Sequence, residues 1–183
     1  MRKYCSKDYE TKYLKTILNG GFKMNEQILK ALNDQLNLEL YSAYIYQAMG
    51  AQFASDGWDG FSAWMDAQAQ EEMEHARRIY DFINERGERV ELQAIEKPPF
   101  SWNSVMAAFK DALEHEKKVT KSIHELLSLA RENDDYAAES FLQWFVDEQV
   151  EEEDTVEAII DKIEKVGDTG LFVLDQKMGK REE

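Results

Sequence analysis

Residues 25–55 read NEQILKALNDQLNLELYSAYIYQAMGAQFAS, and this stretch decides the fold class. Its apolar side chains recur every three or four residues, at Ile28, Leu32, Leu36, Ala43 and Tyr46. That period is typical of an α-helix that buries one face. Asp56-Gly57 follows as a stop signal, so the pattern predicts one long helix over residues 25–55.

The rest of the chain continues this pattern. Apolar periodicity predicts three more long helices, over residues 58–86, 104–131 and 135–166, and a short fifth helix after Gly167 to Gly170. The two prolines, Pro98 and Pro99, lie in residues 87–103, which are expected to form a loop. A helix of about 28 residues is about 42 Å long, and a loop of about 17 extended residues spans about 56 Å. We therefore expect an all-α four-helix bundle with one long crossover between helices 2 and 3.

The composition limits the classes of function. The 183 residues include 37 Asp and Glu against 22 Lys and Arg, a net charge of −15, which argues against nucleic acid as a partner. No apolar run approaches the roughly 18 residues that span a bilayer, so no membrane segment is expected. The single cysteine, Cys5, cannot form an internal disulfide, which is typical of a reducing compartment. We expect a cytoplasmic protein that binds neither nucleic acid nor membrane.

Residues 1–23 differ from the rest of the chain in charge. They carry six basic residues against Asp8 and Glu10, a balance of +4, which leaves −19 on residues 24–183. The codons for Gly20-Gly21-Phe22-Lys23 can form a ribosome-binding sequence just ahead of a start codon at Met24. One hypothesis is therefore that translation starts at Met24. The other is that residues 1–23 are a genuine basic leader, loosely attached to a domain that comprises residues 24–183.

Six polar side chains interrupt the apolar faces of the four long helices. At 100° per residue, Glu39 lies on the same face as Leu36 and Ala43, so its carboxylate points into the surface that must be buried. The same reasoning along all four helices gives the full set: Glu39, Glu72, His75, Glu116, Gln149 and Glu152. Each lies near the middle of its helix, and we expect the six to meet at one level of the bundle.

The spacing of these residues repeats between the two helix pairs. In the first hairpin, Glu72 and His75 follow Glu39 by 33 and 36 residues. In the second, Gln149 and Glu152 follow Glu116 by the same intervals. Two similar hairpins would thus present ligands about an approximate two-fold axis. Four buried carboxylates without countercharge would lose hydration and repel one another, so we expect two divalent cations, with His75 as a neutral nitrogen donor. Carboxylates and imidazole without thiolate suit iron or manganese better than zinc.

Single members of the set have simpler interpretations. A lone Glu on an apolar stripe is usually an edge residue whose carboxylate reaches water, and a lone His is usually a satisfied core residue. Agreement across four helices favours metal binding for the set as a whole. Tyr46, seven residues beyond Glu39, stays open between core packing and a redox or supporting role at the site.

Four segments carry a more specific signal: NLELYSAY at 37–44, QEEMEH at 70–75, EHE at 114–116 and FLQWFVDEQVEEE at 141–153. They resemble the motifs of the prokaryotic non-haem ferritins, and the likeness extends over residues 24–178. The resemblance implies a ferritin-like four-helix bundle in which the six residues above form the ferroxidase centre, with Tyr46 beside it. It also implies a third iron site at Glu71, Glu148 and Glu151. The alternative is that these three acids are solvated surface.

Neighbouring families differ from this chain at particular residues. Bacterioferritins have a more symmetric pattern, with Glu-x-x-His on both the second and the fourth helices. This chain instead has Gln149-x-x-Glu152 on its fourth helix. Met73 lies where their haem ligand would be, but it also fits ordinary ferritins, so no haem is expected. Rubrerythrins hold an iron module with four cysteines, which a chain with one cysteine cannot build. The miniature ferritins that coat DNA place their ligands between subunits, which this set within one chain does not require.

The resemblance implies iron storage with ferroxidase activity. Two Fe²⁺ per subunit would be oxidised by O2, or by H2O2, and the product stored as ferric oxyhydroxide inside a hollow homo-oligomeric shell of about 24 subunits. The −19 charge of residues 24–183 would concentrate cations at the pores and inner wall. Two alternatives are a di-iron oxidase or peroxidase that acts as a discrete dimer, and a metal-free helical interaction module.

Overall fold

The computed structural model describes residues 24–179, and every regular element in that range is an α-helix. The chain forms α2 (Glu26–Asp56), α3 (Asp59–Glu85), α4 (Val105–Glu132) and α5 (Tyr136–Met178). The bounds of the first three lie within one residue of the predicted ones, and the all-α four-helix bundle is confirmed. The two hypotheses about residues 1–23 concern residues outside the described range.

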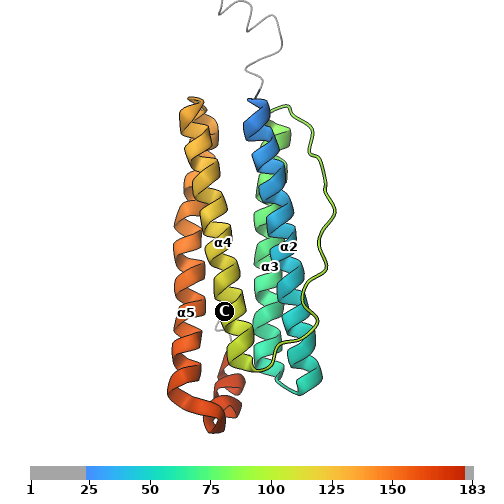
Figure 1. The fold of residues 1–183 in the computed structure, drawn as a ribbon, viewed down its shortest axis with the longest axis vertical. Helices are drawn as coiled ribbons and strands as arrows, with labels where there is room; N and C mark the ends of the chain where they lie inside the picture. The colour runs from blue at the N-terminus through green and yellow to red at the C-terminus, as the bar shows by residue number, and fades with distance from the viewer. Residues whose placement is uncertain (1–23, 180–183) are drawn as a thin grey trace, which may run out of the picture.

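The helices pair as two antiparallel hairpins, α2 with α3 and α4 with α5 (Figure 1). The connection between α3 and α4 runs along the length of α2, so α3 and α4 are parallel, as the loop length predicts (Figure 1). The amide of Gln52 pairs with the backbone of Trp102, whose N–H donates over 2.7 Å and whose carbonyl accepts over 2.8 Å. Near the other end, Asn33 Oδ1 accepts from the Glu91 N–H over 2.8 Å. Side chains of α2 therefore fix the path of the crossover.

Side chains at the helix starts bind backbone amides that have no partner within their helix. Asn25, Ser104 and Asp135 accept hydrogen bonds from first-turn amides of α2, α4 and α5. α2 ends at Gly57, whose φ of 81° lies in the left-handed region that favours glycine. These signals are local in the sequence, which explains why the helix bounds are predictable.

α5 bends sharply at Gly167, where φ is 58° and ψ is −178°. Its last turns lie across the lower end of the bundle in Figure 1 and form the short fifth helix that the sequence predicts. The helix resumes directly after Gly167, instead of after Gly170 as expected, because only Gly167 leaves helical geometry. Asp175, in this segment, is 1% exposed, and its Oδ1 accepts from the Phe61 N–H over 2.9 Å. The segment thus docks on the first turn of α3.

The interior consists of two apolar clusters with a polar layer between them. One cluster includes Tyr46, Phe61 and Phe109, and the other includes Leu32 and Ile123. Each long helix contributes to both clusters, and polar residues occupy the part of each helix that lies between them. The polar layer therefore lies near the middle of the bundle, with apolar packing above and below it.

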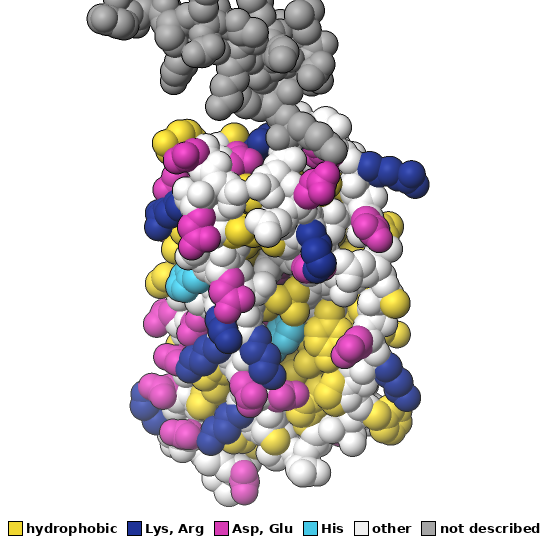
Figure 2. Space-filling model, turned by 45° about the horizontal axis from the view of Figure 1, so that its top comes forward, with side chains coloured by type: hydrophobic (Ala, Val, Ile, Leu, Met, Phe, Trp, Pro, Cys, Tyr) yellow, Lys and Arg dark blue, Asp and Glu magenta, His cyan; other side chains and the backbone are white. Residues whose placement is uncertain are grey.

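The surface of the described residues carries both signs of charge. On the face shown in Figure 2, acidic and basic side chains are interspersed, and hydrophobic side chains gather beside a histidine near the middle. The acidic residues on this face are therefore scattered rather than gathered in one patch.

No helix within residues 24–179 is long and apolar enough to cross a membrane.

Candidate di-metal centre

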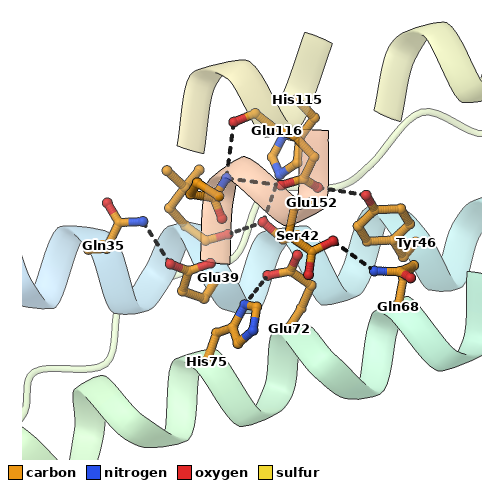
Figure 3. A network of polar contacts seen from close by, with 12 residues as sticks. Gln35, Glu39, Ser42, Tyr46, Gln68, Glu72, His75, His115, Glu116 and Glu152 are labelled. Carbon is orange, nitrogen blue, oxygen red and sulfur yellow. Dashed lines mark hydrogen bonds and ion pairs between the residues drawn. The ribbon is translucent and has the colours of Figure 1, made fainter. Parts of the chain in front are cut away.

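All four helices contribute side chains to the polar layer, and these converge between the ribbons in Figure 3. The six residues singled out from the sequence all lie there, and none is more than 7% exposed: Glu39 from α2, Glu72 and His75 from α3, Glu116 from α4, Gln149 and Glu152 from α5. They face the interior because each interrupts the apolar stripe of its own helix.

Glu39 and Glu72 form the part of the layer contributed by α2 and α3. Gln35 Nε2 donates to Glu39 Oε1 over 2.8 Å, and His75 Nδ1 lies 3.5 Å from Glu72 Oε2. Glu39 Oε2 and Glu72 Oε2 are buried and have no hydrogen-bond partner in the described part of the chain. Burying a carboxylate oxygen without a partner is unfavourable. These two oxygens are therefore suited to bind a cation.

Glu116 and Glu152 form the part of the layer contributed by α4 and α5. The Tyr46 hydroxyl donates to Glu116 Oε1 over 2.6 Å, and Gln68 Nε2 donates to Glu152 Oε2 over 3.1 Å. Tyr46 is fully buried and packs edge-on against Trp64, with ring centroids 6.1 Å apart. Tyr46 and Gln68 are neutral donors, so they orient the two carboxylates without cancelling their charge.

Burial and mutual repulsion raise the pKa values of the central carboxylates. Burial raises the pKa of Glu39 to about 7, although the hydrogen bond from Gln35 acts in the opposite direction. Burial raises the pKa of Glu72 well above its usual range, and the charges of Glu116, Glu39 and Glu152 raise it further. Burial also raises the pKa of Glu116, against the hydrogen bonds from Tyr46 and Gln149. Within residues 24–179, no positively charged group contributes to lowering the pKa of Glu39, Glu72 or Glu116.

Burial has the opposite effect on the histidine of the layer. It lowers the pKa of His75 to about 4, with a smaller contribution from the charge of Arg78. The imidazole is therefore neutral near pH 7 and can bind a metal ion through nitrogen. Its ring packs edge-on against Trp144 and Phe145, at centroid distances of 5.4 and 6.1 Å, which fixes its orientation.

Among residues 24–179, two groups of side chains have the geometry to hold a metal ion. Glu39, Glu72 and His75 each offer a ligand atom within 4.8 Å of the others, and His75, Glu148 and Glu152 form the second group. Carboxylate oxygens with an imidazole nitrogen bind divalent transition metals such as iron and manganese. The geometry therefore fits the cations that the charge pattern predicts.

The acids of the expected third iron site lie at the edge of the layer. Glu71 and Glu148 are half-buried, and Glu151 is exposed. Burial raises the pKa of Glu148, and the charges of Glu151 and Glu71 raise it further. Glu71 and Glu151 are therefore close enough to repel the carboxylate of Glu148, which also lies within reach of a metal ion bound to His75.

Supporting residues around the layer were not predicted. Gln35 and Gln68 lie one helical turn before Glu39 and Glu72, on the same helix faces. This spacing could have indicated from the sequence that they lie beside the two carboxylates. Ser42 Oγ lies 2.7 Å from Nε2 of the buried His115, and Thr120 contacts Gln149. These two contacts join different helices, and no pattern within one helix indicates them.

Comparison with known proteins assigns the family. Residues 29–166 match the sequence profile of the ferritin-like domain. A bacterial non-heme ferritin from Staphylococcus epidermidis is 41% identical over 160 residues, which cover 86% of this chain and 96% of that protein. The chain belongs to the ferritin family. Another ferritin of this kind, from Staphylococcus aureus, is 39% identical over 160 residues and the same shares of both chains.

Solved structures of ferritins agree with this assignment. An open pore ferritin from the hyperthermophilic archaeon Archaeoglobus fulgidus matches with a TM-score of 0.86 and 46% identity, over 87% of this chain and 99% of that one. A closed form of that ferritin, engineered by mutagenesis, matches with a TM-score of 0.85 over 87% of this chain and 98% of that one. The resemblance inferred from the four motifs is confirmed.

Proposed function

We propose that this ferritin is an iron-storage ferroxidase, which oxidises Fe²⁺ with O2 at a di-iron centre within each subunit and keeps the product as ferric oxyhydroxide inside a hollow shell. One observation carries the proposal: four glutamates from four helices meet in a buried layer, where Glu39 Oε2 and Glu72 Oε2 have no hydrogen-bond partner among the described residues. Membership of the ferritin family supports iron as the cargo.

Charge balance supports two ferrous ions in each subunit. Two Fe²⁺ ions bring four positive charges against the four glutamates. Glu39 and His75 would bind the first ion, Glu116, Gln149 and Glu152 would bind the second, and Glu72 would bridge the two. Gln149 adds an oxygen ligand without a fifth negative charge, which would help the more highly charged Fe³⁺ product to leave.

Without metal, the layer would hold protons that iron displaces. Burial raises the pKa of Glu39 to about 7 and that of Glu72 well above its usual range, so the layer would retain protons at neutral pH when no metal is bound. Binding of Fe²⁺ requires the carboxylate form and therefore releases protons. Two Fe²⁺ then supply two electrons, and O2 takes them up with two protons to give H2O2, itself an oxidant for further Fe²⁺. Tyr46 would act beside the ions through its hydrogen bond to Glu116.

Glu71, Glu148 and Glu151 would form a third iron site beside the centre. We propose a cytoplasmic homo-oligomer of about 24 subunits and about 0.5 MDa, to which the excess of acidic residues would attract cations.

The test compares the double variant Glu72→Gln/His75→Asn with the wild type and with Glu74→Gln, a change at an exposed position of the same helix. Anaerobic Fe²⁺ titration should give two tightly bound ions per subunit in the wild type and in Glu74→Gln. The double variant should bind none in the layer and should oxidise Fe²⁺ at least about a hundredfold more slowly. Rapid oxidation in the double variant contradicts the proposed centre.

Sizing after aerobic addition of a few hundred Fe²⁺ per shell tests the storage part. A particle of about 0.5 MDa with an electron-dense core is expected. A species of about 40 kDa that retains two irons would instead indicate a di-iron oxidase that acts as a dimer. Absence of anaerobic Fe²⁺ binding would leave only a structural or interaction role.

A further inference from the structure

The side-chain amide of Gln149 lies against a group of oxygen atoms. Its Nε2 is 3.3 Å from the Glu116 backbone carbonyl, 3.4 Å from Glu116 Oε2 and 3.3 Å from Thr120 Oγ1. Gln149 is only 2% exposed, so its amide binds protein groups rather than bulk water. Thr120 in turn donates to Glu153 Oε1 over 2.5 Å.

The hydrogen atoms in this chain of contacts permit one orientation of the amide. A hydroxyl has a single hydrogen, and that of Thr120 is engaged by the carboxylate of Glu153. Thr120 therefore faces Gln149 only as an acceptor, and the Glu116 carbonyl is always an acceptor. The NH2 end of the amide must point toward both. Rotating the amide by 180° would place its oxygen against two acceptors, in a buried site where an unsatisfied polar group is costly.

This orientation decides which atom of Gln149 can bind a cation. An uncharged amide binds hard and borderline metal ions through its oxygen, and its nitrogen has no lone pair available for coordination. With Nε2 held by Glu116 and Thr120, Oε1 is the atom that remains for a metal ion. Without the Thr120 hydroxyl, one of these contacts is lost and the amide has more freedom to rotate.

We propose that Thr120, oriented by Glu153, is a positioning residue that locks the amide of Gln149 so that its oxygen is presented to a metal ion in the polar layer. The inference rests on the proposed function, because it assigns Gln149 as a ligand of the di-iron centre. It adds two residues that no pattern within one helix indicates. Groups that orient a metal ligand in this way typically change metal affinity by roughly tenfold to a hundredfold.

The test uses the assembled protein and Co²⁺ alone, whose visible absorption reports its coordination. Thr120→Val removes the hydroxyl and keeps the shape, and Thr120→Ser restores the hydroxyl as a matched control. We expect wild type and Thr120→Ser to bind two Co²⁺ per subunit with similar affinity. Thr120→Val should bind the second Co²⁺ roughly tenfold more weakly, with a changed absorption band, while its thermal unfolding midpoint without metal stays close to that of Thr120→Ser.

A double-mutant cycle separates action through Gln149 from an independent effect. Gln149→Leu removes the oxygen ligand, so adding Thr120→Val to it should weaken Co²⁺ binding no further. An undiminished additional loss would overturn the proposal, as would Co²⁺ affinity in Thr120→Val equal to that of the wild type. In both of these cases two Co²⁺ still bind to the wild type, so the proposed di-iron centre is not contradicted. If the wild type binds no Co²⁺ or Fe²⁺ in the layer, the proposed function fails and this inference fails with it.

Discussion

The central carboxylates connect the stability of this ferritin to the iron binding that we propose. Glu39 and Glu72 are each 1% exposed, and each has an oxygen without a hydrogen-bond partner among the described residues. Their raised pKa values mean that the folded protein takes up protons that the unfolded chain releases near neutral pH. Metal ions would replace those protons, so the same charges that disfavour the metal-free protein favour the loaded one.

We predict that Glu39→Gln stabilises the metal-free protein more strongly at pH 8 than at pH 5. The folded-state pKa of Glu39, about 7, lies above its usual value of 4.5, so its contribution to stability is present at low pH and is lost as the pH rises through 7. The glutamine amide of the variant does not titrate. The advantage of the variant should therefore grow by about 2 kcal/mol between pH 5 and pH 8.

The measurement is the thermal unfolding midpoint of both proteins in a metal chelator, as a function of pH. Comparing variant with wild type matters because two buried histidines act in the opposite sense. Burial lowers the pKa values of His75 and His115 to about 4, which costs stability as the pH falls below 6.5, and this effect is common to both proteins. A pH-independent difference between the two proteins would refute the prediction.

At the scale of an element, the direction of the last turns of α5 depends on Gly167. Its combination of φ 58° and ψ −178° is open essentially to glycine alone. The bend brings the segment back to α3, where a Cβ added at Gly60 would lie 1.7 Å from the Asp175 carbonyl oxygen. One glycine therefore permits the turn, and another permits the close contact of two backbones at its end.

We predict that Gly167→Ala destabilises the protein by about 1–3 kcal/mol, because alanine at this backbone geometry is strained although its Cβ meets open space. Gly57→Asn is the matched control, since Gly57 has a left-handed geometry with φ 81° and ψ 23° that asparagine tolerates. Thermal unfolding should show a clear loss for Gly167→Ala and a small one for Gly57→Asn. Equal midpoints for Gly167→Ala and the wild type would contradict a glycine-dependent bend.

An ion pair joins the two hairpins of the bundle. Arg86, at the end of α3, donates to both oxygens of Asp135, at the start of α5, over 2.9 and 3.0 Å. The side chains are only 19% and 11% exposed. Burial alone would raise the pKa of Asp135, but hydrogen bonds from Arg86 and from the Ala138 amide keep it below its usual value. The pair therefore links a helix end to a helix cap across the bundle.

We predict that Arg86→Met destabilises the protein by about 2 kcal/mol, because it leaves the carboxylate of Asp135 largely buried without its cation. The double variant Arg86→Met/Asp135→Asn should recover part of this loss, since asparagine can still cap α5 and carries no charge. Denaturant unfolding of both variants is the measurement. If the double variant is no more stable than Arg86→Met, the unpaired charge is not the cause.

The helices, their order and the set of inward-facing polar residues could all be predicted from local patterns in the chain. These properties follow from the regular rotation of side chains around a helix and from caps such as Ser104, both of which are local in the chain. The reach of the loop determined that α3 and α4 are parallel. The four motifs indicated the ferritin family, and the comparisons agree.

The groups that hold the inward-facing side chains became known from the packing of the helices. The contacts of Tyr46 with Glu116, Thr120 with Gln149 and Asp175 with Phe61 join residues that lie 70, 29 and 114 positions apart. Helix periodicity specifies the face on which a side chain lies, but not the atom that meets it from another helix. That choice depends on the relative height and rotation of packed helices, which the two apolar clusters set together.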